Sequence, residues 1–323
     1  MSITGSAGAA TELRRLMRDE LEQGRAFWAY LGGLSLEQPN NHSLLQGLFR
    51  RMGLGIGGMA FTGPPSRVVL DWSRVERMSA EGFAQFAVMV GTLLDGGCQV
   101  TILSPAWSDL QQALAELGLC SWPPSVSWVE CDVVPTSRIQ ALVPAAIFGG
   151  PLGRGNIGEF LDGLSRELRR LNASKQPAEL LEAAAIELTQ NSHAYATGAR
   201  VVVVALMEHR RRPRRIQIGL ADAGPGISNH LLQRLEHERL APFTDFTVVE
   251  TVLAHALTGR VGGHGGGFSR LAERITKQHE GSVWVRSGEG LVRFGEGGGG
   301  RMSGVRLGAG FGTQVRVTLP IQG

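Results

Sequence analysis

Long apolar runs, cysteine and lysine are all scarce in this chain, and their scarcity limits the classes of protein to which it can belong. The apolar runs, such as residues 201–207, are far below the ~20 residues that a helix needs to cross a bilayer. The opening MSITGSAGAATELRR carries no apolar signal core, so we expect a cytoplasmic location. The three cysteines, Cys98, Cys120 and Cys131, are an odd number without metal-ligand spacing. Because they lie in apolar or strand-like stretches, we expect reduced thiols in the core.

Only two lysines are present, Lys175 and Lys277, so the small net charge of +3 comes almost wholly from arginine. The one dense basic cluster, residues 210–215, is interrupted by Pro213 and lies between two strand-like segments. Proline stops strand pairing, so this cluster is expected at the solvated tip of a hairpin. We therefore do not expect nucleic acid or a membrane as a partner.

The length of 323 residues and the alternation of patterns predict an α/β protein of two domains. Residues 1–65 are predicted to be a helical and irregular segment, with helical periodicity over 9–31. Strand and helix patterns alternate over 66–148 and predict a first α/β domain. A linker rich in glycine and broken by Pro151 follows at 149–156, and a second domain occupies 157–323.

The first domain contains RVVLDWSRV, SAEGFAQFAVMVGTLLDGG, CQVTILS and SDLQQALAELGL in order. Over residues 66–120 it resembles a STAS domain, the fold of anti-sigma-factor antagonists. At the position where phosphorylatable members carry the acceptor serine, this chain has Glu81, within Ser79-Ala80-Glu81-Gly82. The resemblance implies a protein-binding surface fixed in one state by that carboxylate. A simpler interpretation is that Ser79 caps the helix and Glu81 favours its first turn.

Four motifs in the second domain carry chemistry. They are ELTQNSHA around Glu187 and Asn191, LADAGPGI at 220–227, VGGHGGGFSRL at 261–271, and GTQVRVTLP at 312–320. Glu187 and Asn191 are four residues apart and so lie on one face of a helix. On its own, such a pair would be expected on the solvated face of a helix. On its own, Asp-Ala-Gly would be expected in an ordinary turn. The ordered series favours an anion-binding site instead, because glycine-rich loops present backbone N–H groups to phosphates.

This series resembles the ATP-binding domain of the GHKL superfamily, a two-layer α/β sandwich with a mixed sheet found in gyrase-type topoisomerases, histidine kinases and anti-sigma-factor serine kinases. The resemblance implies ATP and Mg²⁺ as cofactors. It implies that Asn191 is the magnesium ligand, that Glu187 is the catalytic base, and that Asp222 accepts the adenine amino group.

The same resemblance assigns the glycines and a threonine to nucleotide binding. Gly224 and Gly226 let the base approach the backbone, and Thr313 reaches adenine through water. Gly263, Gly265 and Gly267 form the phosphate-binding loop, although Gly266 stands where a leucine is usual. The equally open alternative for Thr313 is a β-branched residue of a terminal strand.

Two functions remain open at the level of the sequence. The first is an enzyme that hydrolyses ATP or transfers its phosphate to a partner protein, as an anti-sigma-factor serine kinase does. The second is a nucleotide-gated switch that binds a partner with little or no turnover, and homodimerisation is compatible with either. A histidine kinase is disfavoured, because His42 is the only histidine before Asn191 and lacks the usual acidic neighbour.

Overall fold

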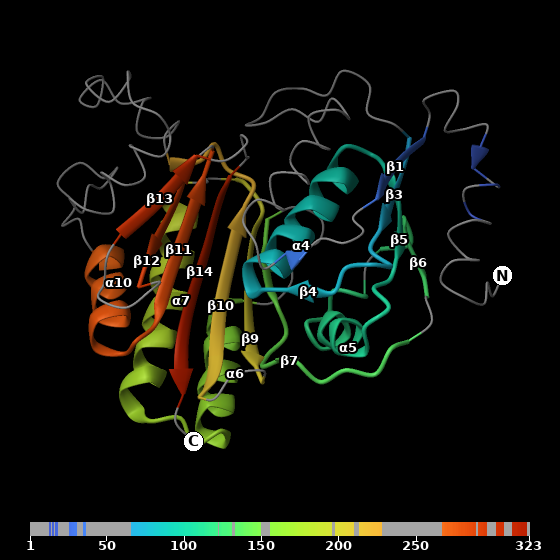
Figure 1. Cartoon of the computed structure of the whole chain (residues 1–323). Helices are drawn as coiled ribbons and strands as arrows, with labels where there is room; N and C mark the ends of the chain where they lie inside the picture. The colour runs from blue at the N-terminus through green and yellow to red at the C-terminus, as the bar shows by residue number, and fades with distance from the viewer. Residues whose placement is uncertain are drawn as a thin grey trace, which may run out of the picture.

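The computed structural model describes residues 66–121, 123–130, 133–149, 156–195, 198–209, 213–227, 267–288, 290–295, 302–306 and 312–321, together with 26–30, 35–36 and residues 13, 15, 17 and 18. Two sheets form its framework, and helices cover both faces of the larger one (Figure 1). This arrangement agrees with the expected α/β class. None of the described helices combines the length and apolar character needed to cross a membrane.

The smaller sheet has the order β1-β3-β5-β6 and is entirely parallel. Its strands are β1 (Ala26–Tyr30), β3 (Arg67–Asp71), β5 (Gln99–Leu103) and β6 (Val126–Val129). The runs RVVLD and QVTIL are rich in β-branched residues and are mostly buried, as expected for parallel strands covered on both faces. A two-residue parallel pair, β2 (Ser35–Leu36) with β4 (Arg77–Met78), lies beside this sheet.

The helix predicted over residues 9–31 is wrong at its C-terminal end. Residues 26–30 form β1, which pairs with β3 from Ala26↔Arg67 to Tyr30↔Asp71. Farther upstream, the Met17 N–H donates to the Leu13 carbonyl as in a helical turn. The strand forms because a partner distant in sequence satisfies its backbone groups, and local periodicity does not report such a partner.

The larger sheet has the order β13-β12-β11-β14-β10-β9-β7, with β8 also pairing with β9. Its strands are β7 (Ile139–Ala141), β8 (Ala146–Phe148), β9 (Val201–Glu208), β10 (Arg214–Asp222), β11 (Ser282–Ser287), β12 (Gly290–Phe294), β13 (Met302–Arg306) and β14 (Thr313–Ile321). Each of these pairings is antiparallel, so the described strands do not form the mixed sheet that was expected for this domain. Strands β9 and β10 form the hairpin expected around the arginine cluster.

Residues 139–148 belong to this larger sheet, because β7 and β8 both pair with β9. The sequence-based boundary at 148 therefore does not coincide with the boundary between the two sheets.

Three helices cover one face of the larger sheet: α6 (Ile157–Arg170), α7 (Lys175–Tyr195) and α10 (Gly267–Gln278). They bury a core against alternating residues of the strands, including Val203, Ile218 and Val317. Asn156 caps α6 by accepting the Glu159 N–H at 2.7 Å. Packing against β9, β10 and β14 fixes the position of α7 relative to the strand ends.

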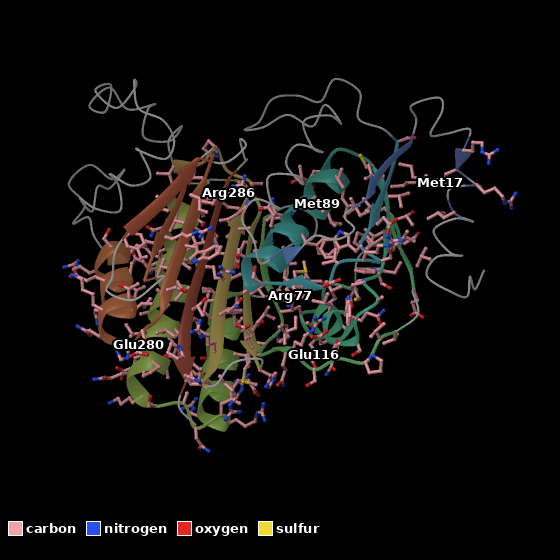
Figure 2. All side chains as sticks on the ribbon, in the orientation of Figure 1. Met17, Arg77, Met89, Glu116, Glu280 and Arg286 are labelled. Carbon is pink, nitrogen blue, oxygen red and sulfur yellow. The ribbon has the colours of Figure 1, made fainter. Side chains whose placement is uncertain are left out.

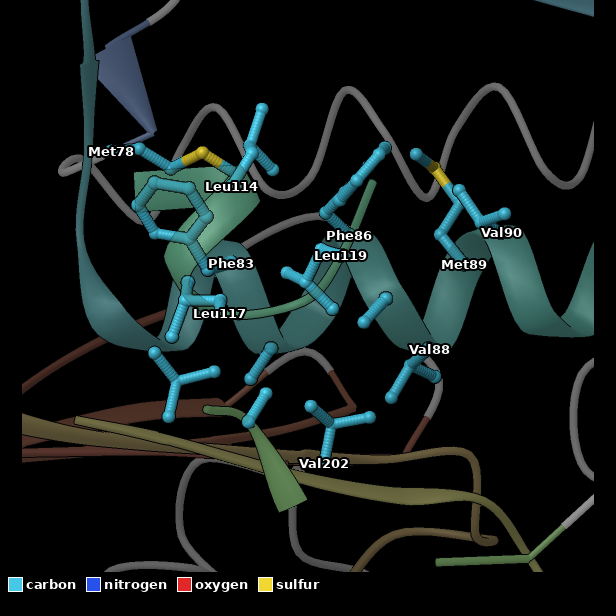
Figure 3. Close-up of a cluster of buried hydrophobic side chains, with 14 of the residues drawn as sticks. Met78, Phe83, Phe86, Val88, Met89, Val90, Leu114, Leu117, Leu119 and Val202 are labelled. Carbon is cyan, nitrogen blue, oxygen red and sulfur yellow. The ribbon is translucent and has the colours of Figure 1, made fainter. Parts of the chain in front are cut away.

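Helix α4 (Ala80–Asp95) covers the opposite face and lies between the two sheets (Figure 1), while α5 (Ser108–Glu116) packs near β7. Thirteen of the sixteen residues of α4 are buried, so it is a core helix with no solvated face. Figure 3 shows Val88 near Val202 of β9, whereas Phe86 and Met89 project from other sides of the helix. The hydrophobic core cluster that contains α4 also includes residues of β3, β5 and β9.

Polar contacts fix the N-terminal end of α4 on the larger sheet. Glu81 pairs with Arg316 of β14 at 3.1 Å, and both side chains are 8% exposed. The Ala80 N–H donates to the Gln217 side chain of β10 at 3.1 Å. Gly219 of β10 permits this approach, because a Cβ there would lie 2.1 Å from the Ala80 carbonyl carbon and the Glu81 nitrogen.

These contacts correct two expectations. Ser79 stands at the N-cap position but makes no side-chain capping hydrogen bond, and Gln217 accepts the first helical N–H instead. Glu81 is buried in an intramolecular ion pair, so it does not present a carboxylate to an external partner. The cysteines also differ from expectation, because Cys98 is buried but Cys120 is exposed, while Cys131 lies outside the described residues.

Candidate functional site

The candidate residues gather at one end of the larger sheet. Asp222 ends β10 and pairs with Val201 at the start of β9. Thr313 begins β14 and pairs with Ser287, the last residue of β11. The antiparallel registers therefore bring segments from four distant parts of the sequence into one row across the sheet.

Asp222 is the most constrained residue of this row. Its Oδ1 accepts the backbone N–H of Gly224 at 2.9 Å and of Thr313 at 3.0 Å, and Ser192 Oγ donates to its Oδ2 at 3.4 Å. Only 3% of the residue is exposed. Burial raises the pKa of the carboxyl group to about 6, against the lowering effect of these three hydrogen bonds.

Glycines shape the backbone around Asp222. Gly312 has φ +68°, and a Cβ there would lie 1.8 Å from the Asp222 carbonyl oxygen. Gly226 has φ +84°, and a Cβ there would lie 2.7 Å from Ser287 Oγ. The Ser287 hydroxyl accepts the Ile227 N–H at 2.7 Å, which fastens the turn after β10 to the end of β11. Side chains are thus kept away from the space next to the carboxylate.

Helix α7 supplies the second group of residues. Asn191 Nδ2 donates to Glu187 Oε1 at 3.3 Å, so the two side chains lie together on one face as their spacing predicts. The next residue, Ser192, reaches Asp222 and connects this face to the strand end. The Glu187 carboxylate also lies against the start of α10, where a Cβ at Gly267 would be 2.5 Å from Oε1.

The structure brings together seven of the residues assigned from the sequence: Glu187, Asn191, Asp222, Gly224, Gly226, Gly267 and Thr313. Gly263 and Gly265 lie outside the described residues. Thr313 contributes a backbone N–H to Asp222, a contact that the sequence did not indicate.

Sequence reasoning missed Ser192 and Ser287. The position of Ser192 directly after Asn191 was a usable signal, because the helix turn that carries Asn191 faces the strand ends. Nothing in the sequence marks Ser287, which is distant from Ile227 and meets it only through strand pairing.

These atoms fit a bound adenine nucleotide. Within the described part of the chain, Asp222 Oδ2 receives only the long hydrogen bond from Ser192, so the buried carboxylate can accept a further donor such as an exocyclic amino group. Asn191 uses Nδ2 to contact Glu187, which leaves Oδ1 for a hard cation. No cluster of three or more His, Cys, Asp or Glu side chains able to hold a metal occurs in the described ranges.

Residues 177–323, a little under half of the chain, match the family model described as "Histidine kinase-, DNA gyrase B-, and HSP90-like ATPase". This segment is a GHKL-type ATPase domain, and the resemblance inferred from the four motifs is confirmed for it. No curated protein matches the chain. The STAS resemblance of residues 66–120 stays a prediction.

Proposed function

We propose that the protein binds Mg²⁺-ATP at the end of the larger sheet and hydrolyses it or transfers its phosphate to a partner protein. The observation that carries this proposal is Asp222, a buried carboxylate at a strand end inside the matched ATPase segment. A buried acceptor that faces C6 of the base selects adenine over guanine, because guanine has a carbonyl oxygen at C6 in place of the amino donor.

The chain's own residues would divide the work as follows. Asp222 accepts the amino group of the base, held in orientation by Gly224, Thr313 and Ser192. Asn191 presents its carbonyl oxygen to magnesium, which neutralises phosphate charge when bound. Glu187 takes the proton of the water or hydroxyl that attacks the terminal phosphate. The contact between Glu187 and Asn191 places the base one helical turn from the metal ligand.

A partner protein is part of this proposal, as in anti-sigma-factor serine kinases. The STAS-like segment is the part of the chain proposed to bind it. Because the start of α4 is buried against β10 and β14, the partner would contact another surface of that segment.

The second candidate is a nucleotide-gated binding switch with little or no turnover. Helix α4 favours it, because α4 packs on β9, β10 and β14, the strands that carry or adjoin the proposed base-binding end. Nucleotide binding would then alter the N-terminal unit, which consists of the smaller sheet with helices α4 and α5, without any chemistry.

Variants of α7 separate the two candidates. Glu187→Ala should retain ATP and lose turnover by about 10²–10⁴-fold, because a general base contributes little to ground-state binding. Asn191→Ala should instead weaken Mg²⁺-ATP itself, since the metal loses its protein ligand. Gln190→Ala, an exposed position between them, should change neither property. Radiolabelled ATP, followed into water or protein, and calorimetric titration give the two readouts.

If Glu187→Ala turns over ATP at the wild-type rate, Glu187 is not the general base. Absence of turnover in the wild-type protein, with ATP still bound, would leave the binding switch as the function.

A further inference from the structure

Arg200 belongs to the ATPase domain, and its buried guanidinium contacts helix α4 of the N-terminal unit. It directly precedes β9, and its side chain is 2% exposed. Its Nη2 lies 3.0 Å from both carboxylate oxygens of Asp95, the last residue of α4. Among the described residues, its Nε and Nη1 have no hydrogen-bond partner. Because burying a charge is costly unless it is paired, the placement of this guanidinium depends on Asp95.

Helix α4 is shaped to receive this guanidinium. A Cβ at Gly91 would lie 2.1 Å from Arg200 Nη1 and 2.3 Å from Cζ, so glycine leaves the space that Arg200 fills. Glycine weakens a helix interior, and an aspartate at a helix C-terminus opposes the helix dipole. Gly91 and Asp95 both depart from what a stable helix prefers, and contact with Arg200 explains both departures.

The main chain of Arg200 supports the proposed base-binding end. The Ala223 N–H, immediately after Asp222, donates to the Arg200 carbonyl at 2.9 Å. Asp222 itself pairs with Val201, the neighbour of Arg200. A displacement of Arg200 from α4 would therefore act directly on Ala223 and, through Val201, on Asp222 itself.

We propose that Arg200 is a positioning residue that makes nucleotide binding depend on the docking of α4. Its side chain is held by Asp95 and by the space that Gly91 leaves, and its backbone carbonyl holds the N–H of Ala223, the residue after Asp222. This inference rests on the proposed function, because it assumes that ATP binds next to Asp222. It extends that function by identifying the element through which the N-terminal unit regulates the site.

Asp95→Asn in the full chain tests the link, because Asp95 is 46% exposed and its replacement removes only the negative charge that pairs with Arg200. Hydrogen–deuterium exchange of the amides of residues 221–227, without nucleotide, should become about tenfold faster. The affinity for Mg²⁺-ATP should fall about 5–10-fold, a typical magnitude for coupling between sites. The control is Glu116→Gln, which likewise replaces an exposed carboxylate by a carboxamide but on α5 (Figure 2). It should leave both measurements unchanged.

A second variant separates coupling from a general loss of stability. In an Arg200→Met background, Asp95→Asn should have no further effect on exchange or affinity, because the partner charge is already absent. Wild-type exchange and affinity in Asp95→Asn would overturn the inference. So would equal effects of Asp95→Asn in both backgrounds. Faster exchange at 221–227 in a protein that never binds ATP would support the positional link and defeat the proposed function instead.

Discussion

Burial of Asp222 places a carboxyl group with a pKa of about 6 at the end of β10. The three groups that donate to it favour its charged form, but removal from water has the larger effect. The position is costly for folding at neutral pH and useful for binding, because an ionised and incompletely satisfied acceptor is what an adenine amino group requires. A functional role explains why the chain keeps this carboxylate in its core.

The pH dependence of stability follows from that pKa. In the unfolded chain the pKa is near 3.8, lower than in the folded protein, so the folded state binds the proton more tightly. The contribution of Asp222 to the free energy of unfolding is therefore largest below about pH 4 and falls as pH rises to about 6. Relative to Asp222→Asn, the wild-type protein should lose up to about 3 kcal/mol over this window.

Urea denaturation of both proteins without nucleotide, at several pH values, measures this difference. The contributions of other titrating groups to the free energy of unfolding are the same in both proteins and cancel in the difference. A difference that stays constant from pH 4 to 7 would show that Asp222 is not a buried, partly unsatisfied carboxyl group.

At the scale of elements, helix α7 was predictable and β1 was not. Proline at 177 followed by many alanines and leucines is typical of a helix start and interior, and α7 spans Lys175–Tyr195. The face with Glu187 and Asn191 follows from four-residue spacing alone. Strand β1 depends on pairing with β3, a non-local contact, and its residues continued a helical spacing of apolar positions. The contacts of Ser287 and Thr313 with the turn after Asp222 could not be predicted either, because they too join residues distant in sequence.

Helix α4 supports a prediction at this scale. Glu81→Ser leaves Arg316 buried without its carboxylate, and breaking a buried pair costs about 3–5 kcal/mol. Arg316 also lies over Trp284, 3.6 Å from the ring centroid, so the residual cation keeps one favourable contact and the lower end of that range is expected. Chemical denaturation should show this loss, while Glu116→Ser on the exposed face of α5 should change stability by less than about 0.5 kcal/mol.

Equal stability of the Glu81→Ser and wild-type proteins would mean that the ion pair does not hold α4 to the sheet. New binding of an external protein by that variant would instead show that Glu81 occludes a partner surface.

At the scale of the whole molecule, the layers are a sheet, a buried helix, a second sheet and a helical layer (Figure 1). Apolar residues lie around all sides of α4, as is typical of a buried helix. Which elements pack against each side of α4 could not be predicted. This packing depends on contacts between residues distant in sequence, Gly219 with Ala80 and Arg200 with Gly91. The N-terminal unit therefore forms one structural body with the sheet that carries the proposed nucleotide site.

Calorimetric titration of the full chain with ATP and with GTP, both with Mg²⁺ at pH 8, tests the central claim most directly. ATP should bind, and GTP should bind at least about tenfold more weakly, because guanine carries a carbonyl oxygen at C6, where adenine carries the amino group that the buried Asp222 carboxylate accepts. Asp222→Asn should weaken ATP by about 1–3 kcal/mol while remaining folded by circular dichroism. Equal affinities for ATP and GTP, or an Asp222→Asn protein that binds ATP as tightly as the wild type, would contradict the assignment of this end of the sheet as an adenine site.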